Sequence, residues 1–144
     1  MTENPRKPKI LLIDDAEIMR RYLRLALGDD RYEFLEAQRA DVALEILRSE
    51  PDIALILCDQ TMPGGSGLSF LEAKNQRPET ARIPVLMVTS MRSKKMIEEG
   101  KRLGVMHWLT KPIEKKAVAA FVRQILEVEA EKKEDENRYQ QRVD

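Results

Sequence analysis

Four short apolar runs constrain the fold of this chain more than any other feature of its sequence. They are ILLI from Ile10, IALILC from Ile53, IPVLMV from Ile83 and VMHWL from Val105. Because the runs are nearly continuous rather than alternating, we expect strands covered on both faces, as in a parallel sheet flanked by helices. A weaker fifth candidate strand is YEFLEA from Tyr32.

Segments with the apolar spacing of helices lie between these runs. They include Ile18, Tyr22 and Leu25 with Met19, Leu23 and Ala26, and later groups around Val42–Leu47, Leu68–Ala73 and Met96–Leu103. Strand and helix patterns alternate five times, which predicts a doubly wound α/β fold with right-handed crossovers. The 144 residues suffice for one such domain. Ligands of such sheets bind at the carboxyl ends of the strands.

The end of the sequence changes character after the last helical stripe. That stripe, with Val118, Val122 and Ile125 among its members, ends at Val128, and EAEKKEDENRYQQRVD follows. Pairs at i,i+4 spacing such as Glu129 with Lys133 favour continuation of the helix into solvent. We therefore predict a flexible arm at 1–8, a domain at 9–128 and a charged, helical or frayed tail at 129–144. A coiled coil is the less favoured interpretation of the tail.

Composition argues against several classes of protein. Lys plus Arg and Asp plus Glu both number 25, so no net field draws the chain to nucleic acid or to an anionic membrane. No apolar stretch approaches the roughly 20 residues that cross a bilayer. The amino-terminal segment does not resemble a secretion signal, and the lone Cys58 lies in an apolar run, so we expect a buried thiol and a cytoplasmic location.

Polar residues follow the candidate strands where each strand ends. Counting YEFLEA as the second candidate strand, Asp14 and Asp15 follow the first strand, Asp59 the third, Thr89 the fourth and Lys111 the fifth. Carboxylates gathered at one rim of a sheet repel each other unless a cation joins them, and oxygen ligands favour Mg²⁺. Mg²⁺ commonly also binds phosphate oxygens, to which a lysine and a hydroxyl are suited. A carboxylate there can itself accept a phosphoryl group.

Each of these residues also has an ordinary structural interpretation. Asp14 and Asp15 are at the expected start of a helix, where acids act as N-caps, and Asp59 precedes a turn-forming MPGG. Only the convergence of all the candidates on one rim favours a functional site. GGSGL from Gly64 lacks both the final glycine of a hydrolase elbow and the ending of a nucleotide-binding loop.

Four motifs in this order resemble the receiver domain of two-component response regulators. They are DD at Asp14, CDQTMPGGSGL around Asp59, VTS with Thr89 and LTKP with Lys111, and the resemblance spans about Lys9 to Glu127. It implies a flavodoxin-like, doubly wound, five-stranded parallel sheet of order 2-1-3-4-5 with five flanking helices. The last helix is the one that the charged tail can extend.

The resemblance also implies roles for residues at the rim. Asp59 would accept phosphate from a phosphohistidine on a partner kinase. Asp15, Asp59 and the main-chain carbonyl of Thr61 would hold Mg²⁺, with Asp14 helping through water. Lys111 would pair with the phosphoryl group.

A conformational switch is part of the same resemblance. The hydroxyl of Thr89 would move to the bound phosphoryl group, and the aromatic Trp108 would turn inward. These movements would alter the face formed by the family's fourth helix, fifth strand and fifth helix. Trp108 stands where Tyr or Phe is usual, and the bond before Pro112 resembles one that is cis in the family.

The function expected from the sequence is therefore that of a signalling phospho-acceptor rather than an enzyme in the usual sense. Its partners would be a sensor histidine kinase or phosphotransfer protein and a downstream protein, without direct nucleic-acid contact or membrane insertion. The alternatives are a receiver from a longer regulator with an output domain and a phosphate-independent pseudo-receiver. A metal-dependent phosphatase is less favoured, because Thr61 stands where such enzymes need a second acid.

Overall fold

A five-stranded parallel sheet forms the centre of the protein in the computed structural model, which describes residues 6–143. The strands are β1 (Lys9–Ile13), β2 (Glu33–Ala37), β3 (Ile53–Cys58), β4 (Val85–Thr89) and β5 (Val105–Thr110). Their order across the sheet is β2-β1-β3-β4-β5, and every pairing is parallel. The predicted flavodoxin-like order is confirmed, including the weak candidate that became β2.

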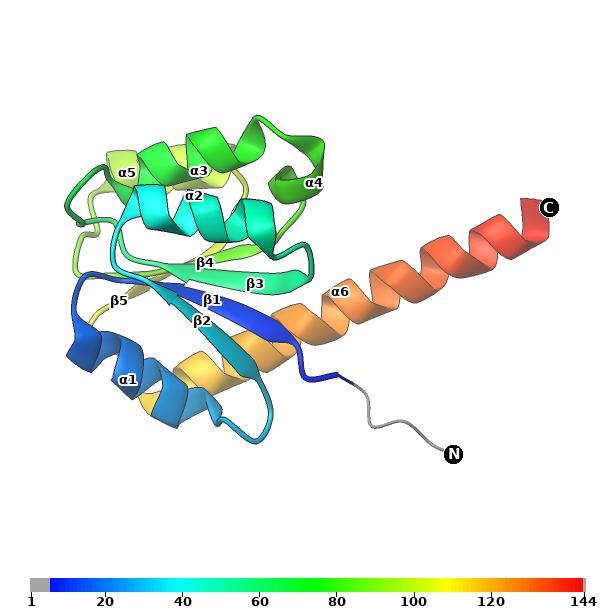
Figure 1. Ribbon diagram of the computed structural model, residues 1–144, viewed down its shortest axis with the longest axis horizontal. Helices are drawn as coiled ribbons and strands as arrows, with labels where there is room; N and C mark the ends of the chain where they lie inside the picture. Colours follow the sequence, from blue (N-terminus) through cyan, green and yellow to red (C-terminus); the bar gives the residue numbers. More distant parts are fainter. Residues whose placement is uncertain (1–5, 144) are drawn as a thin grey trace.

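Helices cover both faces of the sheet (Figure 1). They are α1 (Glu17–Leu27), α2 (Ala40–Ser49), α3 (Gly67–Asn75), α4 (Pro78–Ala81), α5 (Lys94–Arg102) and α6 (Lys115–Val143). Figure 1 shows α1 and α6 on one face and the other four helices on the opposite face. Helices on both faces are what right-handed crossovers produce in a doubly wound sheet.

The continuous apolar runs are explained by a core on each side of the sheet. Successive side chains of a strand point to opposite faces, so Ile10 and Leu12 pack toward α1 and α6, while Leu11 and Ile13 pack toward α2 and α3. All four are at most 1% exposed, and Cys58 is buried as expected. The burial of these positions therefore sets the residue at which each strand ends.

Two apolar residues of the predicted helix α1 do not face the core. Leu23 and Leu27 are buried on the sheet side, whereas Ile18 is 85% exposed and Leu25 is 65% exposed. The apolar spacing predicted the helix correctly. It could not tell which of the apolar residues would be covered.

The segment QRPETARIP, predicted to be a polar connection, contains the short helix α4. The structure therefore adds one helix to the five that the sequence predicted. Pro78 lies at its first turn, where a proline has no hydrogen bond to lose. The buried Thr80 donates its hydroxyl to the carbonyl of Lys74 at 2.7 Å, which ties α4 to the end of α3.

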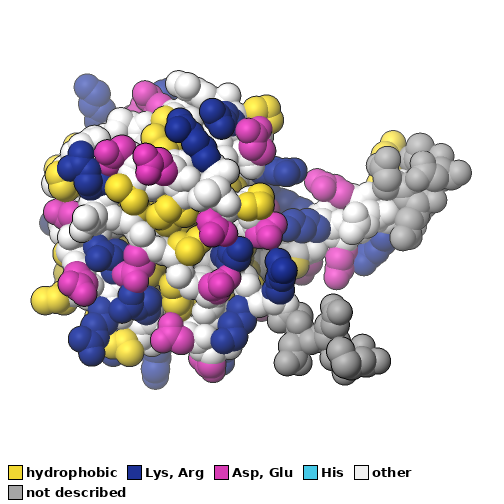
Figure 2. Space-filling view, viewed as in Figure 1, with side chains coloured by type: hydrophobic (Ala, Val, Ile, Leu, Met, Phe, Trp, Pro, Cys, Tyr) yellow, Lys and Arg dark blue, Asp and Glu magenta, His cyan; other side chains and the backbone are white. Residues whose placement is uncertain are grey.

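Helix α6 contains 29 residues and projects well beyond the sheet (Figure 1). Val122 and Ile125 are buried in the core, whereas Val128 is 39% exposed. Charged side chains of both signs cover the projecting part (Figure 2). The helical continuation expected of the tail is confirmed to Val143, while residues 1–5 of the predicted arm and residue 144 lie outside the described residues. Over 6–143, no helix combines the length and the apolar character needed to cross a membrane.

Candidate functional site

Three aspartates meet at the carboxyl ends of the two central strands. Asp14 and Asp15 follow β1, and Asp59 follows β3, whose last residues pair with those of β1. The amide of Asp59 donates to the carbonyl of Ile13 at 2.9 Å, so the ladder continues into the site. Carboxylate oxygens of the three aspartates lie within 4.8 Å of one another. Within 6–143 no other group of acids, histidines and cysteines is placed to hold a metal.

The three aspartates differ in burial and in local bonding. Asp14 is 3% exposed and Asp59 is 7% exposed, whereas Asp15 is exposed to solvent. Asp14 accepts a hydrogen bond from the amide of Ala16 at 2.9 Å. The N-cap residue of α1 is Ala16, and no side chain caps it. The two acids are therefore not the N-caps that the structural interpretation of the sequence allowed.

Lys111 bridges the two buried carboxylates. Its Nζ lies 2.8 Å from Oδ2 of Asp14 and 3.1 Å from Oδ2 of Asp59. Lys111 directly follows β5, and its amide donates to the carbonyl of Thr89 at 2.9 Å. The Lys111–Pro112 peptide bond is cis, as the resemblance implied. An ammonium group and two carboxylates thus converge from three different strands.

Burial and pairing act against each other in this cluster. Burial raises the pKa of Asp14, and the hydrogen bond from Lys111 offsets only part of that shift. Burial also lowers the pKa of Lys111, but hydrogen bonds and charge from Asp14 and Asp59 outweigh it, so that pKa is raised overall. The lysine is thereby kept protonated beside the acids.

The loop after Asp59 is held by main-chain contacts. Gln60 is buried: its side-chain oxygen accepts from the amide of Leu68 at 2.9 Å, and its main-chain carbonyl accepts from the amide of Gly67 at 2.9 Å. A Cβ at Gly67 would lie 2.4 Å from the carbonyl oxygen of Asp59, so only glycine fits there. Thr61 is exposed, and its amide faces Oδ1 of Asp59 at 3.4 Å.

Thr89 and Trp108 are connected through Met91. Thr89 is fully buried, and its hydroxyl accepts from the amide of Met91 at 3.2 Å. The indole Nε1 of Trp108 donates to the carbonyl of Met91 at 2.7 Å. The ring packs on Gly100 of α5, where a Cβ would lie 3.0 Å from Cζ3 of the indole. Trp108 therefore reaches the acidic cluster only indirectly.

Arg20 belongs to the site although the sequence did not single it out. Its guanidinium donates to the carbonyl of Asp14 at 2.6 Å and to Glu36 of β2 at 2.8 Å. Arg24, one turn later, pairs with the same glutamate but has no hydrogen bond to Asp14. The acids just before the basic segment MRRYLR, and a helical register that faces β2, are the signal that could have found Arg20.

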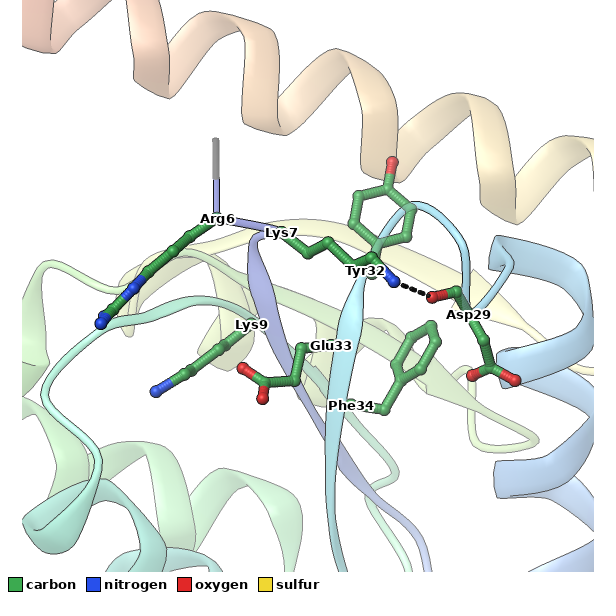
Figure 3. A pocket seen from close by; sticks show the side chains of 7 residues that line it. All are labelled: Arg6, Lys7, Lys9, Asp29, Tyr32, Glu33 and Phe34. Carbon is green, nitrogen blue, oxygen red and sulfur yellow. Dashed lines mark hydrogen bonds between the residues drawn. The ribbon is translucent and has the colours of Figure 1, made fainter. Parts of the chain in front are cut away.

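A cavity of about 650 Å³ lies at the amino end of the sheet, opposite the acidic cluster (Figure 3). Its three cations already have partners. Lys7 donates to the carbonyl of Asp29 at 2.9 Å, Lys9 pairs with Glu50 at 3.0 Å, and Arg6 lies 3.6 Å from Asp52. Because its cations already have acceptors, this cavity is a weaker candidate for a functional site than the acidic cluster.

Comparison with known proteins gives a family for this arrangement. The family model described as the response regulator receiver domain matches residues 10–123. The phosphate regulon transcriptional regulatory protein PhoB of Escherichia coli is 30% identical over 118 residues, which are 82% of this chain and 51% of that protein. The response regulator PleD of Caulobacter vibrioides is 34% identical, over 81% of this chain and 26% of that protein.

Solved structures agree with these sequence relatives. The chemotaxis response regulator CheY4 of Vibrio cholerae superposes with a TM-score of 0.76 at 27% identity, covering 83% of this chain and 99% of that one. The chain spans about half the length of PhoB and a quarter of PleD. Its fold, its acidic rim and these matches together show that the chain belongs to the response regulator receiver domain family.

Proposed function

We propose that this receiver domain accepts a phosphoryl group on Asp59 and signals through the resulting change in its protein contacts. The observation that carries the proposal is the cluster in which Lys111 joins Asp14 and Asp59 beside the exposed Asp15. A nucleophilic carboxylate, two further acids and a fixed cation are the groups that phosphoryl transfer to a carboxylate needs.

The donor atoms at the rim fit Mg²⁺. All three side chains offer carboxylate oxygens within 4.8 Å of one another, and hard oxygen donors are what this ion prefers. Asp15, Asp59 and the carbonyl of Thr61 would hold it, with Asp14 contributing through water. When bound, the ion neutralises charge on the phosphoryl oxygens.

The residues of the chain divide the work of transfer between them. A carboxylate oxygen of Asp59 attacks the phosphorus of a phosphohistidine, a P–O bond forms, and the P–N bond breaks as the imidazole leaves with its proton. Lys111, already beside Asp59 at 3.1 Å, pairs with a phosphoryl oxygen. The buried hydroxyl of Thr89 donates to another oxygen of the group.

The switch follows from the loss of one hydrogen bond. When the Thr89 hydroxyl turns to the phosphoryl group, the amide of Met91 loses its acceptor, and the loop before α5 is free to shift. The indole of Trp108 is bonded to the carbonyl of the same residue, so it moves with the loop. The face of α5, β5 and α6 then changes; these elements correspond to the family's fourth helix, fifth strand and fifth helix.

The proposed partners are a histidine kinase or phosphotransfer protein and a downstream protein. PhoB is named a transcriptional regulatory protein, so one candidate form of this chain is a receiver joined to an output domain. A stand-alone regulator is the other form. The cytoplasmic location expected from the sequence remains a prediction.

Intact-mass measurement after treatment with acetyl phosphate and Mg²⁺ tests the proposal. We expect a gain of one phosphoryl group that is absent from Asp59→Asn and unchanged in Asp52→Asn, a matched change at an exposed acid. Chelation of Mg²⁺ should also abolish the gain. A wild-type protein that gains no mass would instead favour the phosphate-independent pseudo-receiver.

A further inference from the structure

A second cavity, of about 310 Å³, lies between α2, α3 and α4. Helices of a doubly wound sheet run antiparallel to its strands, so the ends of α2 and α3 lie at the rim opposite the aspartates. The cavity is therefore separate from the phosphoryl site. Its lining residues are Leu44, Leu47, Arg48, Ala73, Lys74, Gln76, Arg77 and Thr80.

Lys74 is the most unusual residue of this cavity. It is 3% exposed and occupies the core stripe of α3, one turn after Phe70 and Leu71. Its ammonium group donates only to neutral acceptors, the carbonyl of Ala81 at 2.9 Å and the side-chain oxygen of Asn75 at 3.2 Å. Burial lowers its pKa to about 8, and no carboxylate opposes that shift.

Two arginines add to this charge at the rim. Arg48 at the end of α2 and Arg77 just before α4 are both exposed, and both line the cavity. Neither they nor Lys74 form a salt bridge with any described residue. The cations of the larger cavity, by contrast, are paired with acids or a carbonyl. The smaller cavity thus holds three positive charges and no acid among its lining residues.

The remaining wall of the cavity is largely apolar. Leu44 and Leu47 line it from α2 and Ala73 from α3, and Gln76 contributes an amide group. A volume of about 310 Å³ is at the lower end for small-molecule sites. Apolar walls beside a cluster of cations suit a small ligand with an anionic head and a less polar body.

We propose that the cavity between α2, α3 and α4 binds a small phosphate monoester through Lys74, Arg48 and Arg77. An entering dianion supplies the countercharge that Lys74 lacks, and arginine guanidinium groups bind phosphate through paired hydrogen bonds. The leucines of α2 cover the organic body. Basic residues at the last turns of α2 and α3 also complement the helix dipoles, and that purely structural role is the alternative.

Binding is tested by NMR titration of the Asp59→Asn protein without Mg²⁺. The substitution removes the acceptor carboxylate, so the probes cannot react at the phosphoryl site. The probes are inorganic phosphate and adenosine monophosphate. We expect saturable shifts confined to amides at the ends of α2 and α3 and in α4, with the nucleotide at least tenfold tighter. Equal affinity for the two probes would support a phosphate-binding site and would contradict the proposal that the apolar wall binds an organic body.

Variants separate binding from folding. Lys74→Met and the double change Arg48→Gln with Arg77→Gln should each weaken binding at least tenfold. The two arginines are exposed, so the double variant keeps the core intact even where Lys74→Met perturbs it. Lys9→Gln removes one charge from the 650 Å³ cavity at the amino end of the sheet and should leave the affinity for the probes unchanged.

Chemical shift changes that never saturate, or that persist in the double arginine variant, would overturn the proposal and leave the structural role of these cations. Acetyl phosphate labels Asp59 at the other rim of the sheet, and no residue of that site lines the cavity, so the labelling result is independent of this one.

Discussion

Two lysine side chains of this domain are largely shielded from solvent, one among carboxylates and the other among neutral groups. Lys111, at the carboxyl rim of the sheet, is held between Asp14 and Asp59. Lys74, at the end of α3, is 3% exposed and meets only neutral oxygen acceptors. Accordingly, the pKa of Lys111 is raised, whereas that of Lys74 is lowered to about 8.

The difference shows which charge the fold itself needs. Lys111 compensates two carboxylates whose burial would otherwise be unfavourable, so its charge stabilises the rim. The charge of Lys74 costs free energy, because desolvation is repaid only by hydrogen bonds to neutral groups. A charge that the fold tolerates without a counter-ion is a candidate for binding one.

Removal of each lysine should have opposite effects on stability. Lys111→Met leaves Asp14 and Asp59 buried without their cation, and we expect a loss of about 3 kcal/mol in the free energy of unfolding without Mg²⁺. Lys74→Met removes a charge and keeps a similar volume, so we expect a gain of about 2 kcal/mol at pH 7. Urea unfolding followed by circular dichroism measures both. A destabilised Lys74→Met protein would show that its hydrogen bond to Ala81 outweighs the cost of its burial.

Divalent cations should act on only one of the two regions. At a Mg²⁺ concentration of about a hundred times the dissociation constant, we expect wild-type stability to rise by roughly 2.7 kcal/mol. Lys74→Met should show the same rise, because its cavity has no acid in its lining. Asp59→Asn, which lacks one ligand, should gain less. Unfolding with and without Mg²⁺ checks this, and equal gains in Asp59→Asn would place the ion elsewhere.

The pH dependence separates the lysines further. The pKa of Lys74 falls from 10.5 when unfolded to about 8 when folded, so between these values the unfolded chain binds more protons and stability rises with pH. The advantage of Lys74→Met over wild type should therefore shrink by about 2 kcal/mol between pH 8 and pH 10. The raised pKa of Lys111 keeps its contribution intact below 10.5, so the deficit of Lys111→Met should stay constant over the same range. Unfolding curves at several pH values test both trends.

The sequence predicted the sheet and the acidic rim for a common reason. A strand buried on both faces must be apolar along its length, so the runs from Ile10 and Ile53 mark where β1 and β3 end. Polar residues directly after those ends then have to meet at one edge. Asp14, Asp59 and Lys111 could be brought together without coordinates because their places follow from topology.

Side chains whose role depends on a tertiary neighbour were not predicted. Lys74 occupies a core position of α3, but a lysine is expected in solvent unless the carbonyl of Ala81 is known to lie nearby. The bond from Trp108 to the carbonyl of Met91 depends on how a loop folds over β5. Arg20 was hidden for the same reason, since it contacts Glu36 of β2 and the carbonyl of Asp14 in the loop before its own helix.

The smallest expected effect concerns Arg20, a half-buried cation that is paired with an acid as Lys111 is, but that also binds the main chain of the acidic loop. Arg20 donates to the carbonyl of Asp14 and to Glu36, whereas Arg24 shares only Glu36. We expect Arg20→Met to weaken Mg²⁺ binding several-fold, because the loop that carries Asp14 and Asp15 loses an anchor, and Arg24→Met to change it by less than twofold. Calorimetric titration with Mg²⁺ measures this, and melting temperatures show how far each variant is destabilised. If both variants bind the ion equally well, the metal site does not depend on the hydrogen bond from Arg20 to the carbonyl of Asp14. Arg20 would then only join α1 to β2.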